Sequence, residues 1–254
     1  MIAKASALLI PVFLLMAAPA PAEIAIAPPE TKLPERERFV FRVKWLGMSV
    51  GEITATINGI KKINGRDAYA LEASAKTNGL LAAVYPVNDR YVSYMDTEKL
   101  YTLRHEVYRR EGRYKKDAVT NFDQAAGMAY FVNFLDGSKK TVKIPPGVQD
   151  SLTAAYYFRM IPVELGRKVE FKVYNNERVY DLFGVADDMR FIRLSRLGRR
   201  AAFHIQPYAR LEGDVVKRGR ASGYFSCDSK RVPLAVSVRG PVFTEVTGYL
   251  AGED

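Results

Sequence analysis

Alternation of apolar with other residues recurs along almost the whole chain, and it limits the fold more than any other feature. In residues 39–45 (FVFRVKW), every second side chain, from Phe39 to Trp45, is large and apolar. A period of two puts these side chains on one face of a β-strand. Similar short segments follow at residues 51–57, 67–75, 90–96, 101–109, 114–122, 128–134, 139–144, 169–173, 178–183, 190–197, 201–208, 219–226, 234–238 and 244–250. The pattern predicts a mainly β protein with a large curved antiparallel sheet, shaped as an open barrel or a clam.

Turn dipeptides separate many of these segments. They are Asn58-Gly59, Asn64-Gly65, Asp136-Gly137, Asn175-Asn176 and Asp187-Asp188. Asn and Gly tolerate the positive φ angles of tight hairpin turns, so sequential strands should pair as neighbours. No interior linker interrupts the series. We expect one β-rich domain over residues 39–250 and a short tail over 251–254; a two-lobed sheet divided near the helix described next is the alternative.

One segment, residues 149–161 (QDSLTAAYYFRMI), is the best helix candidate. Asp150 or Ser151 can cap its N-terminus, and Pro162 must end it. The segment is apolar nearly all round, which is typical of a buried helix. The sheet should therefore pack around this central helix. A short second helix is expected near residues 79–85, between Asn78 and Pro86.

The N-terminus has the features of a secretory signal peptide over residues 1–22. Lys4 precedes an apolar run over residues 5–18, and Ala20-Pro21-Ala22 offers a small-residue cleavage pattern. An N-terminal membrane anchor is the alternative. Residues 23–38, rich in Pro and charge, are expected to form a flexible leader. The mature protein should be exported, most simply to a bacterial periplasm, and no later segment is apolar enough to span a membrane.

The chain is basic, with a formal charge of +10 that falls to +9 when Lys4 is removed with the signal peptide. A positive balance favours anionic partners such as lipid head groups, acidic glycans or nucleic acid. Export argues against nucleic acid. The alternative is that the charge only keeps the protein soluble.

Residues for catalysis are sparse. His105, His204 and Cys227 have no partners at metal-ligand spacing, so no metal or cofactor is expected. Neither a GxSxG motif nor a phosphate-binding glycine loop occurs. A glycan hydrolase would need two carboxylates to converge from a set of four. That set is Asp89, Asp123, Asp150 and Asp228. We expect a protein that is not an enzyme.

Arg159 lies on the same predicted helix face as Tyr156, and burial of that face would bury its guanidinium. A buried charge requires a carboxylate partner. The candidates are Asp89, Asp123 and Asp228. Alternatively, Arg159 holds an anionic ligand inside a cavity. The 15 tyrosines and 13 phenylalanines suit the wall of a cavity for an amphiphile, although packing in the core explains each one equally well. The candidate binding residues are Trp45, Tyr85, Tyr156, Tyr157 and Arg159.

Several short motifs occur in a characteristic order. They are Trp45-Leu46-Gly47 with Gly51-Glu52, Gly79-Leu80 with Tyr85-Pro86-Val87-Asn88-Asp89, Phe122-Asp123, Gln149-Asp150-Ser151-Leu152 with Tyr156-Tyr157-Phe158-Arg159, and Asp228-Ser229-Lys230-Arg231-Val232-Pro233. In this the chain resembles, over roughly residues 39–250, the exported bacterial family catalogued as domain of unknown function 3108. The resemblance implies export and an antiparallel β fold with a packed helix, but no activity. Such an architecture is similar to the lipoprotein-localisation carriers, in which a curved sheet holds acyl chains.

Three functions are compatible with these features. The first is a non-enzymatic binder or carrier of a lipid or another amphiphile of the cell envelope. The second is a structural or scaffolding partner in envelope assembly. The third is an envelope-glycan hydrolase that uses paired aspartates.

Overall fold

The computed structural model describes residues 24–216, 221–239 and 244–254, so the predicted signal peptide over 1–22 lies outside the described residues. Within these ranges the chain forms seventeen strands and two helices, which confirms the predicted mainly β fold. The strands are β1 (Arg36–Trp45), β2 (Met48–Ile63), β3 (Arg66–Thr77), β4 (Asn88–Asp96), β5 (Thr102–Glu111), β6 (Tyr114–Asp123), β7 (Met128–Asn133), β8 (Lys139–Lys143), β9 (Gln149–Asp150), β10 (Lys168–Asn175), β11 (Arg178–Leu194), β12 (Gly198–Ile205), β13 (Tyr208–Leu211), β14 (Asp214–Val215), β15 (Ala221–Ser226), β16 (Pro233–Arg239) and β17 (Glu245–Glu253). The helices are α1 (Gly79–Val84) and α2 (Ser151–Met160).

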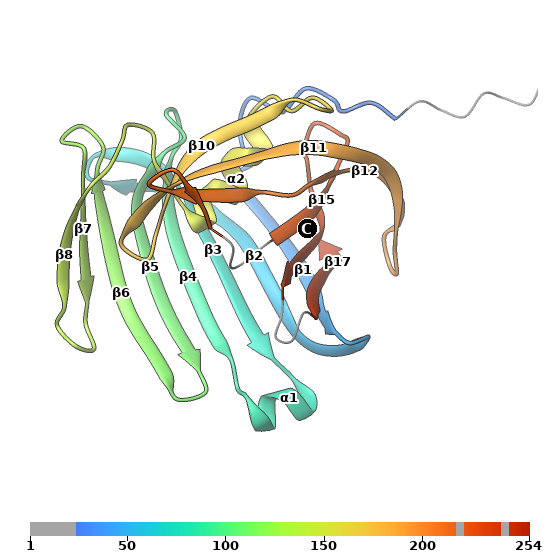
Figure 1. Cartoon of the computed structure of the whole chain (residues 1–254), viewed down its shortest axis with the longest axis horizontal. Coiled ribbons are helices and arrows are strands. Elements are labelled where there is room, and N and C mark those ends of the chain that lie inside the picture. The colour runs from blue at the N-terminus through green and yellow to red at the C-terminus, as the bar shows by residue number, and fades with distance from the viewer. Residues whose placement is uncertain (1–23, 217–220, 240–243) are drawn as a thin grey trace, which may run out of the picture.

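Strand β1 joins the two walls of the curved sheet, because it pairs with β2 on one side and with β17 on the other. The first wall continues from β2 in sequence order to β8. The second wall runs from β17 through β16, β15 and β12 to the second half of β11. The first half of β11 instead pairs with β10 and β13. The two walls diverge from β1 like an open clam (Figure 1).

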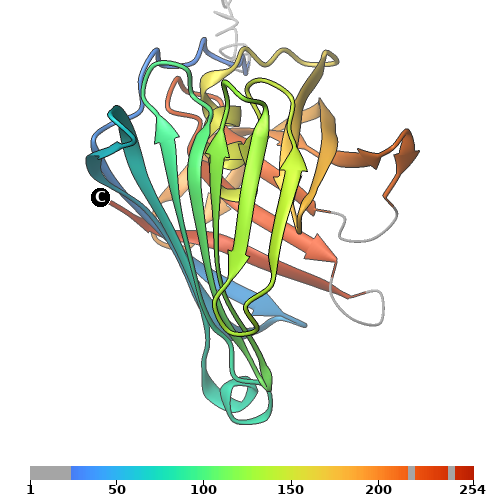
Figure 2. The same cartoon turned by 90° about the vertical axis from the view of Figure 1, so that its left-hand side faces the viewer.

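Helix α2 lies between the two walls, on the concave side of the sheet (Figures 1 and 2). On one side, Tyr156 packs into a cluster with Leu71 and Met95 of the first wall. On the other side, Phe158 contacts Phe203 and Phe225 of the second wall. The predicted central helix is confirmed. It begins at Ser151 rather than at residue 149 because the two preceding residues form β9, which pairs with β10.

The turn dipeptides divide into true hairpin turns and bulges within strands. Asn64-Gly65 connects β2 to β3 with φ angles of 49° and 80°, as predicted. Asn58-Gly59, in contrast, lies inside β2 at a register shift, where the Gly59 N–H donates to the carbonyl of Glu35 at 2.8 Å. Asp187-Asp188 lies inside β11 at another shift, so the predicted strands 178–183 and 190–197 belong to one strand. Bulges of this kind bend a strand without ending it.

Both ends of the predicted domain are longer than expected. Leu33, predicted to lie in the leader over 23–38, is buried in the cluster that contains Tyr156, and β1 already begins at Arg36. At the other end, β17 runs to Glu253 and pairs with β1, so most of the predicted tail over 251–254 belongs to the sheet. Residues 36–38 pair with β2, and Gly252 and Glu253 pair with β1, because β1 has a neighbour on each side. No helix within the described ranges is long and apolar enough to cross a membrane.

Candidate functional site

The part of the concave surface formed by β3, β16 and β17 is apolar and lined with small residues. Residues opposite each other in an antiparallel pair share a face of the sheet. Leu71, which contacts α2, therefore defines the inner face of the first wall, and Ala73 and Ala75 follow it along β3. On the second wall, Gly248 of β17 and Val236 of β16 are paired and share the inner face. Side chains this small do not fill the space between the walls.

An apolar pocket of about 320 Å³ lies beside α2, and we call it the α2 pocket. The helix contributes Ala154, Ala155 and Phe158. The second wall and β10 contribute mainly aliphatic, aromatic and glycine residues: Val169, Phe171, Leu182, Phe183, Gly184, Ile205, Pro207, Ala221, Gly223, Phe225 and Val236. The side chain of Ala155 is exposed and lines the pocket, so no large side chain of the helix fills the space at this position.

A second apolar pocket, of about 540 Å³, lies at the other end of the concave surface and is called the α1 pocket. Trp45, Val50 and Ile53 line it from β1 and β2, and Leu81 and Tyr85 line it from α1 and the residue after it. The Trp45 indole N–H donates to Thr244 at 2.9 Å, which holds the ring at this position. Two of the predicted binding residues, Trp45 and Tyr85, are thus brought together.

A polar pocket of about 320 Å³ adjoins the α2 pocket, and Ser151 lines both. Its wall includes Tyr91, Arg109 and Lys116. Burial raises the pKa of Tyr91 to about 12, so its hydroxyl stays protonated at neutral pH. The Lys116 ammonium pairs with Glu177 at 3.1 Å, which limits the positive charge left for a ligand.

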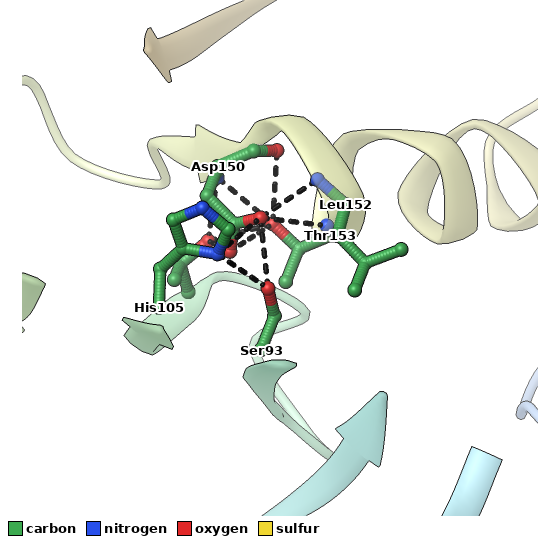
Figure 3. Close-up of polar contacts among 6 residues, drawn as sticks. Ser93, His105, Asp150, Leu152 and Thr153 are labelled. Atoms are coloured by element: carbon green, nitrogen blue, oxygen red, sulfur yellow. Dashed lines mark hydrogen bonds and ion pairs between the residues drawn. The ribbon is translucent and has the colours of Figure 1, made fainter. Parts of the chain in front are cut away.

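The N-terminus of α2 is held by the buried carboxylate of Asp150, as Figure 3 shows. Its Oδ1 accepts from the backbone N–H groups of Leu152 at 2.7 Å and Thr153 at 3.1 Å. The same carboxylate accepts from the hydroxyls of Ser93 at 2.9 Å and Thr102 at 3.1 Å. This one side chain therefore caps the helix and ties it to β4 and β5.

Ser93, His105 and Asp150 meet in this cluster but are not arranged as a nucleophilic triad. Ser93 Oγ and Asp150 Oδ1 both lie near the same imidazole nitrogen, Nδ1, at 2.8 and 3.4 Å. In a triad the acid and the nucleophile contact opposite nitrogens of the ring. Ser93 is also fully buried. We interpret the cluster as structural.

Arg159 forms its ion pair with Glu37 and not with Asp89, Asp123 or Asp228, so the predicted partners were wrong. Its two terminal nitrogens donate to the Glu37 carboxylate at 2.6 and 2.8 Å, and Nε donates to the carbonyl of Lys230 at 3.1 Å. Both side chains are nearly buried, with exposed fractions of 4% and 10%. Glu37 reaches the helix because β1 starts before Phe39, within the segment predicted to be a leader.

The three aspartates that were proposed for Arg159 have local roles. Asp89 accepts from the backbone N–H of Arg110 at 2.8 Å, and burial raises its pKa. Asp123 accepts from the N–H of Ala126 at 2.9 Å, in the turn after β6. Asp228 accepts from Ser226 Oγ at 2.9 Å and from N–H groups of the following turn. None of the three lines the α1 or the α2 pocket.

The remaining predicted binding residues lie in the core rather than in a pocket. Tyr156 is 4% exposed, and burial raises its pKa. Tyr157 packs edge-on against Phe171 at 5.2 Å and so supports the wall of the α2 pocket from behind. Arg159 is enclosed between the rings of Phe39 and Tyr156, at 5.2 and 5.4 Å. Of the five residues, the structure therefore brings only Trp45 and Tyr85 to a common pocket wall.

Arg231 was missed in the sequence and has a structural role. It is 1% exposed, and burial lowers its pKa. Its guanidinium donates to the carbonyls of Ile161, at the end of α2, and of Ala27, in the N-terminal segment. A buried arginine that meets backbone carbonyls leaves no sequence signal. Within the described ranges, no three potential metal ligands come together.

Comparison with known proteins identifies the family. The family model described as "Protein of unknown function (DUF3108)" matches residues 40–245. The chain belongs to the DUF3108 family. The matched range contains α2 and every residue that lines the α2 pocket, so both belong to the DUF3108 domain. A search of curated proteins finds no matching relative.

Solved structures show similarity at the level of the fold. The β-barrel-like protein of domain of unknown function DUF1849 from Brucella abortus gives a TM-score of 0.58 at 7% identity, over 86% of this chain and 97% of that chain. A protein from Bacteroides fragilis described as exported, with a YmcC-like fold, gives 0.36 at 7% identity, over 91% and 99%. A protein described as a lipoprotein, from Parabacteroides distasonis, gives 0.36 at 8% identity, over 91% and 100%. The Brucella structure supports a shared barrel-like fold for this DUF3108 domain.

Proposed function

We propose that this DUF3108 protein is an exported, non-enzymatic binder or carrier of a lipid or another amphiphile of the cell envelope. The apolar part of the ligand would occupy the α2 pocket. The observation that carries the proposal is the lining of that pocket, which comes almost entirely from aliphatic, aromatic and glycine residues. Burial of hydrocarbon against such a wall is favourable at about 25 cal/mol per Å².

The size and the surroundings of the α2 pocket support an amphiphile. Its volume of about 320 Å³ lies within the usual range for small-molecule sites, about 300–1,000 Å³. The polar pocket adjoins it at Ser151, so a ligand could lay its tail against Phe158 and its head group beside Tyr91 and Lys116. The predicted similarity to lipoprotein-localisation carriers is part of this proposal.

The experiment first identifies a ligand that purifies with the protein and then fills the α2 pocket by a substitution. Protein purified gently from the envelope of an expressing bacterium is weighed by native mass spectrometry, and its organic extract is analysed. We expect a lipid that is released on denaturation. The variant Ala155→Trp should then lower the affinity for a fluorescent fatty acid about tenfold, equivalent to about 1.4 kcal/mol, because the indole fills the pocket.

The matched control is Ala126→Trp, which makes the same change at an exposed position in the turn between β6 and β7. It should leave uptake unchanged. A clean apo mass with no uptake of fatty acid would refute the proposal. Equal uptake by Ala155→Trp and the wild type would also refute the assignment to the α2 pocket.

A further inference from the structure

Exposed apolar side chains gather at one end of the first wall. Because its strands alternate in direction, the connections β1–β2, β3–β4, β5–β6 and β7–β8 lie at one end, which we call the α1 end, away from α2 (Figures 1 and 2). The connections β2–β3, β4–β5 and β6–β7 lie at the opposite end. Eight of the seventeen large apolar side chains that are exposed within the described ranges belong to the α1 end.

The first two connections at the α1 end carry the most exposed of these side chains. Leu80 and Val84 of α1 are 84% and 76% exposed, and Leu46 and Met48 of the β1–β2 hairpin are 65% and 61% exposed. These residues adjoin members of the α1 pocket wall, which include Trp45 and Tyr85. The exposed side chains therefore lie at the mouth of an apolar pocket.

The other two connections at the α1 end also carry exposed apolar side chains. Tyr114 follows the tip of the β5–β6 hairpin, and Phe134 and Leu135 lie between β7 and β8; all three are exposed. By comparison, the loops 64–65, 97–101 and 124–127 at the opposite end, all of them described, carry no exposed large apolar side chain. Exposed large apolar side chains are therefore specific to the connections at the α1 end of this wall and not common to all of its loops.

Helix α1 gains little stability from the protein itself. It has six residues, none of them buried, and Asn78 at its N-cap makes no side-chain hydrogen bond. Isolated helices of this length are marginal in water. Exposed apolar side chains that gather at one end of a molecule are typical of a site of interaction with a protein or a membrane.

Charge indicates which partner fits the α1 end. The hairpin segment 109–116 (RREGRYKK) carries five basic residues and one acidic residue. Three of the basic residues are ion-paired: Arg109 with Glu111, Arg110 with Asp117 and Lys116 with Glu177. The hairpin segment is held beside α1, because the Gly112 N–H donates to the carbonyl of Pro86 at 2.8 Å. Arg113 and Lys115 are exposed and form no ion pair with any described residue. The whole segment 77–88 contains no acidic residue.

We propose that the α1 end docks on an anionic lipid surface, with Leu80 and Val84 inserted among the lipids and the 109–116 hairpin against the head groups. Apolar side chains beside basic residues are the usual composition of interfacial membrane-binding segments. The proposal rests on the outer surface of the α1 end and does not depend on a ligand in the α2 pocket.

The test measures binding of the envelope-purified protein to sedimented vesicles of phosphatidylcholine alone or mixed in equal parts with phosphatidylglycerol. Wild-type protein should prefer the mixed vesicles. The double variant Leu80→Ser with Val84→Ser should bind both compositions roughly tenfold or more weakly. Arg113→Gln with Lys115→Gln should lower binding to the mixed vesicles by roughly tenfold or more and leave the phosphatidylcholine result unchanged.

The matched control is Leu165→Ser with Val215→Ser, which removes an exposed Leu and an exposed Val outside the α1 end. Vesicle binding should not change. The docking proposal is wrong if Leu80→Ser with Val84→Ser binds vesicles as tightly as the wild type. It is also wrong if the wild type binds neither kind of vesicle. A third outcome is that the wild type binds a lipid-free envelope protein but no vesicle, and that Leu80→Ser with Val84→Ser loses this binding. The surface would then belong to a protein partner, and the docking proposal would be wrong.

Vesicle binding and fatty-acid uptake separate the two proposals. Uptake that is sensitive to Ala155→Trp, without vesicle binding, would leave the carrier function in place and remove the docking surface. Vesicle binding that is weakened by Leu80→Ser with Val84→Ser, without fatty-acid uptake, would support the docking surface and refute the carrier function.

Discussion

The two helices of this protein differ in almost every property that stabilises a helix. Helix α2 has ten residues, five of them buried, and Asp150 caps it with its side chain. Helix α1 has six residues, no buried side chain and no side-chain cap. Helix α2 packs against both walls and lies between them. Helix α1 instead exposes its apolar side chains to solvent, which is typical of a surface that contacts a partner.

The loops around each helix differ in the same way. At the end of the first wall opposite the α1 end, which we call the α2 end, the carboxylates of Asp96 and Asp150 accept several hydrogen bonds each from turns and helix termini. At the α1 end, the connections carry exposed Leu, Met, Phe and Tyr. Hydrogen bonds therefore hold the connections at the α2 end, whereas the connections at the α1 end expose apolar side chains to solvent.

Asp150→Ala should have the largest effect. It removes the cap of α2 and a buried acceptor shared by the hydroxyls of Ser93 and Thr102, so we expect the free energy of unfolding to fall by about 4 kcal/mol. Urea unfolding followed by circular dichroism measures the change. Asn78→Ala at the cap of α1 is the control and should cost less than about 0.5 kcal/mol. Equal losses of unfolding free energy for the two substitutions would contradict the difference in stability between α1 and α2.

Glu37→Ala should come next, with a loss of about 3 kcal/mol, because it leaves the guanidinium of Arg159 buried without a counter-charge. Chemical unfolding again gives the value. The double variant Glu37→Leu with Arg159→Met removes both charges and should recover most of the loss. If the double variant is no more stable than Glu37→Ala, the cost comes from lost packing and not from the unpaired charge.

Asp96→Asn tests the polar turn at the α2 end and should cost about 1–2 kcal/mol at pH 7. Burial of the Asp96 carboxyl opposes its ionisation, but hydrogen bonds from Arg66 and from the backbone N–H groups of Lys99 and Glu98 outweigh it, so its pKa is lowered. The stabilisation is therefore complete above the ordinary value of about 3.9 and is lost as the pH falls through the lower pKa of the folded state. The difference between wild type and variant, measured by unfolding at a series of pH values, should shrink below about pH 4. A difference that grows in acid would contradict the lowered pKa.

Leu80→Ser with Val84→Ser should have the smallest effect on stability, within about 0.5 kcal/mol, because both side chains are already exposed to water. Thermal unfolding of the purified variant checks this. A large loss would show that α1 is packed in solution, and the contrast with α2 would then disappear.

Local patterns predicted the elements of this fold well. The period of two predicted most strands, and the sequence QDSL predicted a helix capped by Asp150 or Ser151, of which Asp150 is the cap in the structure. Asn64-Gly65 predicted a hairpin turn correctly, but Asn58-Gly59 did not, although the two dipeptides are alike. The difference is the carbonyl of Glu35, which accepts from the Gly59 N–H and turns that site into a bulge.

The candidate site was less accessible to prediction. Burial of Arg159 implied that a carboxylate must pair with it, but its partner Glu37 lies 122 residues away in the chain. The α2 pocket depends on residues such as Ala155 and Gly223, which come from a helix and a strand far apart in sequence. Small residues at inward positions are the signal, but they indicate a cavity only once the opposite wall is known.

The sequence by itself determined the mainly β class, the central helix with its cap, and the ordered motifs of the DUF3108 family. These depend on periodicity and on hydrogen bonds between residues a few positions apart, which a linear sequence displays. The tertiary structure alone decided the partner of Arg159, the two apolar pockets, and the grouping of Leu46, Leu80 and Tyr114 at one end of a wall. Those features arise from contacts between distant segments, and the antiparallel course of the strands, rather than any local pattern, determines which loops become neighbours.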